Sequence, residues 1–155
     1  FSLVLGPGRL FFVKLHNPNK RTSKLTSIDL DSIKLKNLKI IDKFPQKPIM
    51  FNSSIEIKIS SKSTLDSQYL KKLKNICNDP VIVYEKSGKR FEKQIFSLSY
   101  KKLSLSNFSL FMKVEGGLPI RRFIEGGDVS PNISDILNCK CTCEEFDFHD
   151  IEVWS

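Results

Sequence analysis

A glycine pair at positions 116 and 117 is the feature that most constrains how this chain can fold. The run Phe108–Glu115 is typical of a β-strand and ends at the pair, and a basic, apolar segment follows at once. Glycine lets the backbone turn sharply and approach another group closely. The sequence therefore predicts a tight bend around which residues 113–137 are organised.

Two arginines, Arg121 and Arg122, follow the bend, between the apolar residues Ile120 and Phe123–Ile124. A guanidinium held just after the end of a strand is well placed to pair with a carboxylate or a phosphate. The same spacing is also typical of a surface helix whose charged face is merely solvated. Spacing alone leaves both interpretations open.

The length and composition favour one domain. With 155 residues, 40% of them hydrophobic, the chain can bury one sizeable core, so we expect a single domain over residues 1–155. It has no apolar run long enough for a membrane span and no signal-peptide core, which favours a cytoplasmic protein with no membrane partner. Because Phe1–Leu5 is typical of a strand interior and no Met precedes it, we expect the domain to be N-terminally incomplete.

The net charge is +8, and it is unevenly distributed. Residues 1–112 contain 21 Lys and Arg against 8 Asp and Glu, whereas residues 113–155 contain 4 against 9. A strongly positive field favours a polyanionic partner, and nucleic acid before an anionic membrane, because no basic amphipathic helix is evident. Charge alone gives affinity without defining a reaction.

A first basic region follows a predicted N-terminal strand. Arg9–His16 is rich in aromatic and branched residues, which predicts a largely buried strand that begins with the cation Arg9. An Asn-Pro-Asn turn ends it, and Lys20 and Arg21 come next. This order would place cations at the rim of a sheet, where an RNA backbone could reach them. An ordinary polar loop is the alternative.

A second basic region is a predicted hairpin. Val81–Lys86 and Phe91–Lys102 are typical of two strands joined by a tight Ser-Gly turn. Aromatic residues alternate with its cations, a mixture that suits RNA because phosphates pair with cations and unstacked bases stack on aromatic rings. Lysines that prevent aggregation of an edge strand are the alternative. The cations considered for RNA binding are Lys89, Arg90 and Lys93.

The other elements follow from hydrophobic periodicity and turn residues. Residues 22–36 are ambiguous between a short helix and an irregular segment. The remaining expectations are strands over Leu38–Phe44 and Ile49–Ser60, a helix over Leu65–Ile76 capped by Ser63-Thr64, a short helix over Pro131–Asn138, and a closing strand over Lys140–Trp154 with a bulge at Glu144-Glu145.

Familiar catalytic and metal-binding patterns are missing from the sequence. Cys139, Cys141 and Cys143 alternate, which predicts buried reduced thiols on one face of a strand, because zinc knuckles space their ligands more widely. The chain has no phosphate-binding glycine loop and no serine-elbow or metalloprotease motif. Residue spacing alone therefore identifies no enzyme.

Two stretches resemble one enzyme family. LGPGRLFFVKLHNPNKR (residues 5–21) resembles the LGxGRPFxxExxNPxxR stretch of an archaeal and eukaryotic tRNA pseudouridine synthase family, the Pus-ten type, which modifies uridines of the TΨC arm. The closing part from VEGGLPIRRF onward resembles that family's EGGLYIKEF ending, and residues 86–102 weakly resemble its basic RTPxRVxHRR strand. The two main matches stand in the family's order and together cover most of the chain.

The resemblance implies an α/β (α+β) catalytic domain with a mixed, mainly antiparallel sheet and a few short helices. Such enzymes flip the target uridine out of the RNA, and an Asp starts cleavage of the glycosidic bond. They use no metal and no cofactor. A Lys or Arg of the YIKE-like motif keeps the Asp ionised, as a nearby cation should; here that residue is Arg121. The implied partner is tRNA.

The chain also departs from the family pattern. The motif that carries the catalytic Asp would fall upstream of residue 1. The family's uracil-stacking Tyr would fall near Phe51, which can stack but has no hydroxyl group. Pro119 replaces the Tyr of the LYIKE motif, and the Gly-Arg-Thr after the GD pair is missing.

The expected function is therefore that of a tRNA pseudouridine synthase, present here as an N-terminally truncated or divergent C-terminal part. Arg121 and Phe51 would belong to its catalytic site, and Arg9, Lys20, Arg21, Lys89, Arg90, Lys93 and Arg122 would bind RNA. Two alternatives remain: a non-catalytic RNA-binding module, and a structural basic β-rich protein bound to RNA.

Overall fold

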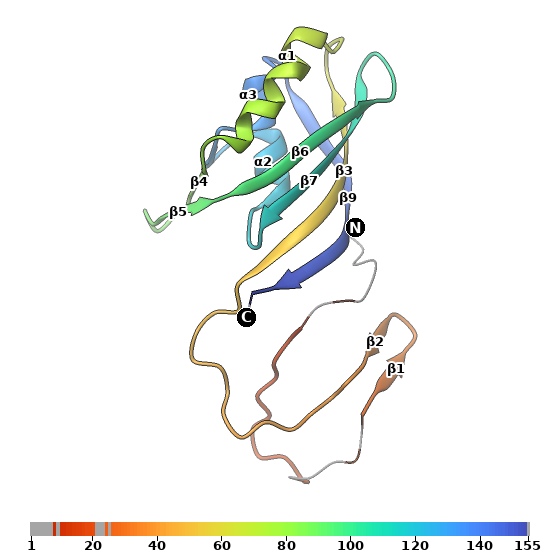
Figure 1. Ribbon diagram of the computed structural model, residues 1–155, viewed down its shortest axis with the longest axis vertical. Coiled ribbons are helices and arrows are strands. Elements are labelled where there is room, and N and C mark those ends of the chain that lie inside the picture. Colours follow the sequence, from red (N-terminus) through yellow and green to blue (C-terminus); the bar gives the residue numbers. More distant parts are fainter. Residues whose placement is uncertain (1–7, 9, 21–23, 25, 155) are drawn as a thin grey trace. The chain divides into compact units, whose positions relative to one another are not determined.

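A computed structural model describes residues 8, 10–20, 24 and 26–154 (Figure 1). The chain divides into two compact units, one containing residues 50–154 and the other residues 10–49. Each unit is described by itself, and the single domain expected over residues 1–155 stays a prediction. None of the helices that the structure describes has the length and hydrophobicity to cross a lipid bilayer.

The larger unit is built on a four-stranded antiparallel sheet, in the order β6-β7-β3-β9. Its strands are β3 (Phe51–Ser61), β6 (Ile95–Lys102), β7 (Asn107–Glu115) and β9 (Cys141–Val153). A second antiparallel sheet, in the order β5-β4-β8, contains β4 (Val81–Tyr84), β5 (Arg90–Lys93) and β8 (Val129–Ser130).

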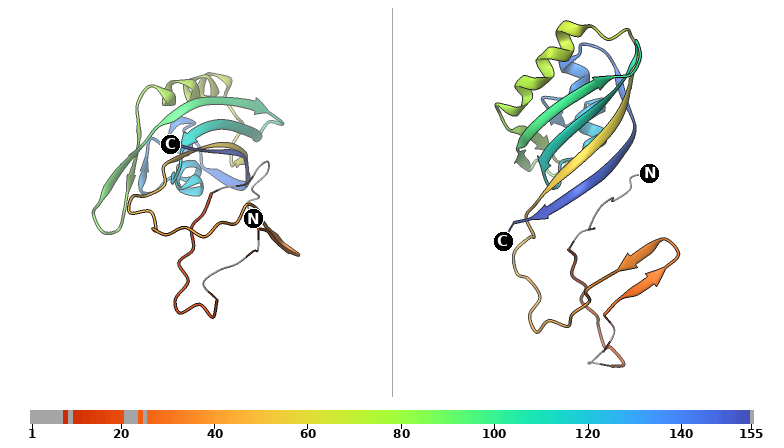
Figure 2. Two further views of the ribbon diagram at one scale, coloured as in Figure 1. Left: turned by 60° about the horizontal axis from the view of Figure 1, so that its bottom comes forward. Right: turned by 45° about the vertical axis from the view of Figure 1, so that its right-hand side comes forward.

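Helices cover one face of the four-stranded sheet (Figures 1 and 2). They are α1 (Ser67–Lys72) with the 3₁₀ helix η1 (Leu73–Cys77), α2 (Ile120–Glu125) and α3 (Ile133–Ile136). The core lies between this face and the helices, because alternate residues of β3, namely Ile55, Ile57 and Ile59, are buried there. The opposite face of the sheet is polar.

The smaller unit has little regular structure in its described residues. A short antiparallel hairpin joins β1 (Ile28–Leu30) to β2 (Ile33–Leu35). The ring of Phe12 packs edge-on against that of Phe44, with centroids 6.1 Å apart. Large apolar side chains of this unit are exposed, among them Leu10, Val13, Leu15 and Ile40.

Several elements match the sequence predictions. The strand expected over Ile49–Ser60 is β3, with its isoleucines on one face, and the strand expected before the glycine pair is β7. The closing strand is β9, and its register shifts where Glu144 would pair, as the predicted bulge requires. Ser87-Gly88 forms the predicted hairpin turn, with Gly88 at φ +80°.

Other predictions are wrong. The described residues of Arg9–His16 and Leu38–Phe44 form no strand, because their apolar side chains find no sheet to join and remain largely exposed. The helix after β3 is capped by Asp66, not by Ser63-Thr64, and its second half is the 3₁₀ helix η1. Phe91–Lys102 is not one strand: it divides at Gln94 into β5 and β6, which belong to different sheets.

The fully buried Ile57 gives a direct test of this core. Replacing Ile57 with Ala should lower the free energy of unfolding by about 2–5 kcal/mol, since both transfer energy and packing are lost. The matched change Ile40→Ala, at a side chain 64% exposed, should alter it by less than about 0.5 kcal/mol. Urea unfolding followed by circular dichroism measures both values, and equal losses would contradict this core.

Candidate functional site

The glycine bend is held by a close approach of backbone to an aromatic ring. The Gly116 amide donates a hydrogen bond to the Phe51 carbonyl, with N and O 2.6 Å apart. A Cβ atom at position 116 would lie 2.4–2.6 Å from ring atoms of Phe51, so only glycine fits without a shift. Gly117 adopts φ +89°, a conformation that other residues rarely take. The sequence thus places glycine where the ring and the turn both require it.

A partly buried ion pair lies at the start of the bend. Lys93 Nζ is 3.1 Å from Glu115 Oε1, and the two side chains are only 19% and 16% exposed. The other carboxylate oxygen accepts a hydrogen bond from the Gln94 amide at 3.3 Å. Lys93 was predicted to bind RNA. Its amino group instead has an acidic partner beside the bend, and RNA contact by Lys93 stays a prediction.

Arg121 lies on the outward side of α2. The helix buries Ile120, Phe123 and Ile124, which leaves the Arg121 side chain exposed. Within the described residues, Arg121 forms no hydrogen bond or ion pair. Its guanidinium is close enough to β9 to influence Cys143: burial raises the pKa of that thiol, and the positive charge of Arg121 opposes the rise.

The C-terminal end of α2 is tied to two neighbouring segments. Glu125 Oε1 accepts a hydrogen bond from the Cys143 amide at 3.1 Å, on the outermost strand of the sheet. The Ser134 hydroxyl donates to the Ile124 carbonyl at 2.9 Å and accepts from the Cys141 amide at 3.0 Å. The helix that carries Arg121 is therefore fixed against β9.

Arg122 is engaged, in contrast to Arg121. Its Nη1 atom lies 3.8 Å from Asp128 Oδ2 and 3.5 Å from the Tyr84 carbonyl oxygen. The Tyr84 amide in turn donates to the Asp128 carbonyl at 2.8 Å. These contacts connect α2 to the β4–β5 hairpin, so the structure brings Arg122 together with the predicted basic hairpin.

The hairpin presents its cations and rings to solvent. Lys89 and Arg90 are exposed, and Arg90 pairs with the equally exposed Glu92 at 2.8 Å. Tyr84 and Phe91 are 45% and 43% exposed. The predicted mixture of cations and aromatic rings is therefore accessible on this hairpin.

Three further residues were predicted to bind RNA: Arg9, Lys20 and Arg21. Lys20 is exposed and belongs to the smaller unit. Arg9 and Arg21 lie outside the described residues. RNA binding by all three stays a prediction.

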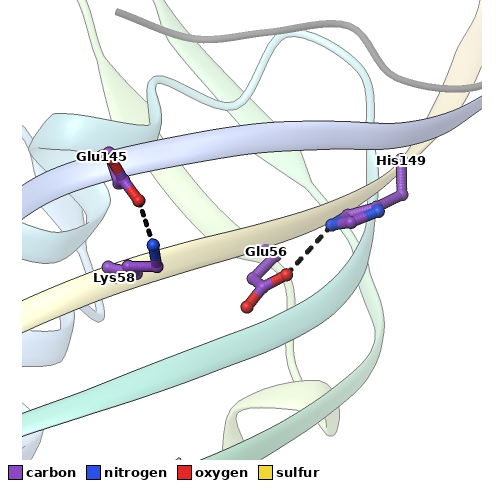
Figure 3. A network of polar contacts seen from close by, with 4 residues as sticks. All are labelled: Glu56, Lys58, Glu145 and His149. Atoms are coloured by element: carbon purple, nitrogen blue, oxygen red, sulfur yellow. Dashed lines mark hydrogen bonds and ion pairs between the residues drawn. The ribbon is translucent and has the colours of Figure 1, made fainter.

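The polar face of the four-stranded sheet carries a lysine–glutamate ion pair and a histidine–glutamate contact (Figure 3). Lys58 pairs with Glu145, and His149 Nε2 lies 3.1 Å from Glu56 Oε2. A shallow depression on this face is lined by Ser54, Ile55, Glu56, Ser97, Ser99, Phe111, Met112, Lys113 and His149. Acids of β9 thus neutralise cations of this face.

The cysteines are free thiols. Of the three that were predicted to be buried, Cys141 and Cys143 are buried, but Cys139 is only partly buried. Burial raises the pKa of Cys141 to about 12, and the neighbouring Cys139, whose sulfur is 3.8 Å away, adds to the rise. Among the described residues, no three His, Cys, Asp or Glu side chains are grouped so that they could hold a metal ion.

Solved structures share this fold. One is titled crystal structure of a Cbf5-Nop10-Gar1 complex, with a TM-score of 0.53 and 11% identity over 63% of this chain and 29% of the matched chain. Another is an H/ACA RNP bound to a substrate RNA containing 2'-deoxyuridine, with a TM-score of 0.50 and 11% identity over 63% and 27% of the two chains. The predicted pseudouridine-synthase-like fold, with mainly antiparallel sheets and few short helices, is confirmed.

Residues 2–152 match the family model described as Pus10, C-terminal. The chain belongs to the Pus10 family. Proteins described as tRNA pseudouridine synthase Pus10 are 55% identical in Nitrosopumilus maritimus and 35% identical in Cenarchaeum symbiosum, each over 98% of this chain. The one in Methanocaldococcus jannaschii is 24% identical over 93%. The family predicted from the two sequence matches is confirmed.

The chain spans about two fifths of the length of these relatives: 40%, 38% and 36% respectively. The family model that the chain matches is that of the C-terminal part of Pus10, so the chain corresponds to that part of the relatives. The roles of individual side chains are not fixed by such matches, so the catalytic and RNA-binding residues stay predictions.

Sequence reasoning missed Glu115 and Gln94, which hold the bend. The only signal was the position of Glu115 directly before two glycines, at the end of a strand. Its partner Lys93 is 22 residues away, in a strand of the predicted basic hairpin. The fold brings these residues together, and the local sequence pattern could not predict their contact.

The contact between Gly116 and Phe51 can be tested by a double-mutant cycle. Gly116→Ala should lower the free energy of unfolding by about 1–3 kcal/mol, because the new Cβ overlaps the ring. In a Phe51→Leu background, Gly116→Ala should lower the free energy of unfolding by less, because the ring that the new Cβ overlaps is absent. Urea unfolding of the four proteins measures the coupling, and additive effects would show that the ring does not restrict position 116.

Proposed function

We propose that this chain is the C-terminal part of the catalytic domain of a tRNA pseudouridine synthase, which isomerises uridine to pseudouridine in the TΨC arm of tRNA in the cytoplasm. The observation that carries the proposal is the match of residues 2–152 to the Pus10 C-terminal model, together with relatives named for this activity. The pseudouridine-synthase-like fold supports it.

Arg121 is the residue proposed to act beside the catalytic carboxylate. The resemblance implies an Asp upstream of residue 1, and a nearby guanidinium keeps such an acid ionised. Arg121 suits this role because its side chain is exposed and forms no ion pair within the described residues. Arg122, one position later, has Asp128 as a partner. The pair of arginines thus divides into one available and one engaged cation.

Phe51 is proposed to stack on the flipped uracil. Its side chain is only partly buried, and it supports the bend that precedes Arg121. A phenyl ring supplies the same stacking surface as a tyrosine ring but donates no hydrogen bond. Phe51 could therefore stack on the uracil ring but could not form the hydrogen bond that a tyrosine hydroxyl group would form.

RNA is proposed to follow the β4–β5 hairpin and α2, not the polar sheet face. Lys89 and Arg90 stand on the hairpin beside exposed aromatic rings, and backbone phosphates and unstacked bases use these two kinds of group. On the sheet face, Lys113 pairs with Glu152 at 2.7 Å and Lys58 with Glu145. Paired cations attract polyanions weakly, and Arg90 is also paired, with Glu92 at 2.8 Å. Lys89 forms no ion pair among the described residues, so it is the hairpin cation that this comparison favours.

The proposed role of Arg121 makes a kinetic prediction for the full-length protein that contains this chain. Arg121→Ala should reduce tritium release from tRNA labelled at uridine C5 by about a hundredfold or more, because one preorganised charge is lost from the transition state. The affinity for tRNA should be nearly unchanged. Arg121→Lys, which keeps the charge, should retain more activity than Arg121→Ala.

Equal activity of Arg121→Ala and the unaltered protein would remove Arg121 from the catalytic site. If the unaltered full-length protein binds tRNA tightly but releases no tritium, the chain belongs to a non-catalytic RNA-binding module, and the proposed reaction fails.

The hairpin cations make a separate prediction about binding. Lys89→Gln with Arg90→Gln should weaken tRNA binding and reduce the slope of log K against log salt by about 1.4–1.8, if each residue contacts one phosphate. Lys58→Gln with Lys113→Gln removes the same charge from the sheet face and should leave the slope unchanged. Filter binding across a salt series measures both. Equal slope changes would place RNA on the sheet face as well.

A further inference from the structure

We propose that the Lys93–Glu115 ion pair is a positioning device, which holds the glycine bend at the angle from which α2 presents Arg121. The pair contacts no reacting atom in this proposal: it acts through the backbone of the bend. The expected effect on kcat rests on the proposed function. The expected effect on the backbone of the bend rests only on the contacts of the bend.

Glu115 joins two sheets through both of its carboxylate oxygens. Oε1 accepts from Lys93 Nζ at 3.1 Å and Oε2 from the Gln94 amide at 3.3 Å. The backbone adds a third bond, from the Glu115 amide to the Gln94 carbonyl at 2.9 Å. Gln94 separates β5 from β6, so the last residue of β7 is clamped at the point where the chain passes from one sheet to the other.

Among the described residues, this ion pair is the least exposed to solvent. In every other ion pair of the described residues, both side chains are at least 29% exposed. Burying two charges carries a desolvation penalty that offsets much of their attraction, so such a pair is weak evidence for stability. In some proteins a polar contact withdrawn from solvent instead selects one geometry out of several. Lys93 and Glu115 stand where geometry matters, at the entry to a bend of two glycines.

The side chains of the pair line the bend directly. A Cβ atom at Gly117 would lie 3.6 Å from both Cε and Nζ of Lys93, so the lysine runs beside the turn. The ring of Phe51 packs against the preceding glycine, Gly116. Glycine itself restricts the backbone little. The direction in which the chain leaves the bend therefore depends on these neighbours.

The distance from the bend to the proposed catalytic cation is short. Only Leu118, Pro119 and Ile120 separate Gly117 from Arg121, and α2 begins at Ile120. The C-terminal end of α2 is held by Glu125 and Ile124, so the bend sets the position of the opposite, N-terminal end, next to which Arg121 lies. Misplacement of a catalytic group by about 1 Å can lower a rate by about 100-fold.

The experiment uses the full-length protein that contains this chain, with steady-state tritium release from tRNA as the assay. Lys93→Met and Glu115→Gln should each lower kcat by about 10- to 100-fold with KM nearly unchanged. The double variant should be no slower than the slower single variant, because either change alone breaks the pair. Lys93→Arg, which keeps the charge, should recover most of the lost kcat.

A matched control removes an ion pair of the same residue types elsewhere. Lys113 and Glu152 are 2.7 Å apart with side chains 37% and 52% exposed, and Lys113 lies on the same strand as Glu115. Lys113→Met and Glu152→Gln should leave kcat within about twofold of the unaltered value, because exposed pairs contribute little. A similar loss of kcat in both sets would overturn the proposal.

A second readout does not depend on catalysis. Hydrogen exchange followed by mass spectrometry should show faster exchange over residues 116–125 in Lys93→Met, with β3 and β9 as protected as before. Unchanged exchange in this segment would overturn the proposal even if the enzyme is active. Faster exchange in a protein without tritium release would uphold the positioning role while the proposed reaction fails.

Two further outcomes are decisive. If Lys93→Met raises KM and flattens the salt dependence while kcat stays the same, Lys93 binds phosphate and the positioning role is wrong. If Lys93→Met and Glu115→Gln fail to fold, Glu115→Asp replaces them, since it keeps the charge and shortens the side chain by one methylene. A fall in kcat at unchanged KM supports the proposal, and an unchanged kcat overturns it.

Discussion

The central strand β3 is the constraint on which the larger unit depends. It pairs with β7 along one side and β9 along the other, so its register fixes both neighbours at once. Its isoleucines bury one face, and a slip of one residue would turn them to solvent. The strand begins at Phe51, whose carbonyl and ring receive Gly116. The register of β3 thus also sets where the bend forms and where α2 begins.

The parts of this arrangement that local pattern encodes could be predicted. Alternation within Ile49–Ser60 indicated β3 and its buried face, and two glycines after a strand indicated the bend. The closing strand and its bulge followed from a change in the parity of buried residues near Glu144. In each case the signal and its structural consequence lie within about ten residues of each other. Period and turn chemistry act over that range.

The parts that were wrong depend on partners distant in sequence. The apolar run at Arg9–His16 has strand composition, but composition supplies no neighbouring strand, and its described residues form none. Phe91–Lys102 is extended throughout, yet its two halves join different sheets because Gln94 bonds to Glu115 and to the Cys77 carbonyl. From the sequence alone, Lys93 is interpreted as a surface cation. Only the fold shows that its partner is Glu115, 22 residues later. Sequence pattern identifies the groups, and only the fold assigns their partners.

Pairing also explains why the net charge is a poor guide to where RNA would bind. The closing part of the chain is acidic, and its strand β9 lies beside β3, where Glu145 of β9 pairs with Lys58 of β3. Charge that is neutralised in this way contributes little to the field around the molecule. Lys89 on the hairpin and Arg121 on α2 form no ion pair among the described residues. They lie on connected elements, because Arg122 contacts the Tyr84 carbonyl. The acids of β9 thereby neutralise two lysines of the sheet face, Lys58 and Lys113, and leave Lys89 and Arg121 charged on the elements proposed to meet RNA.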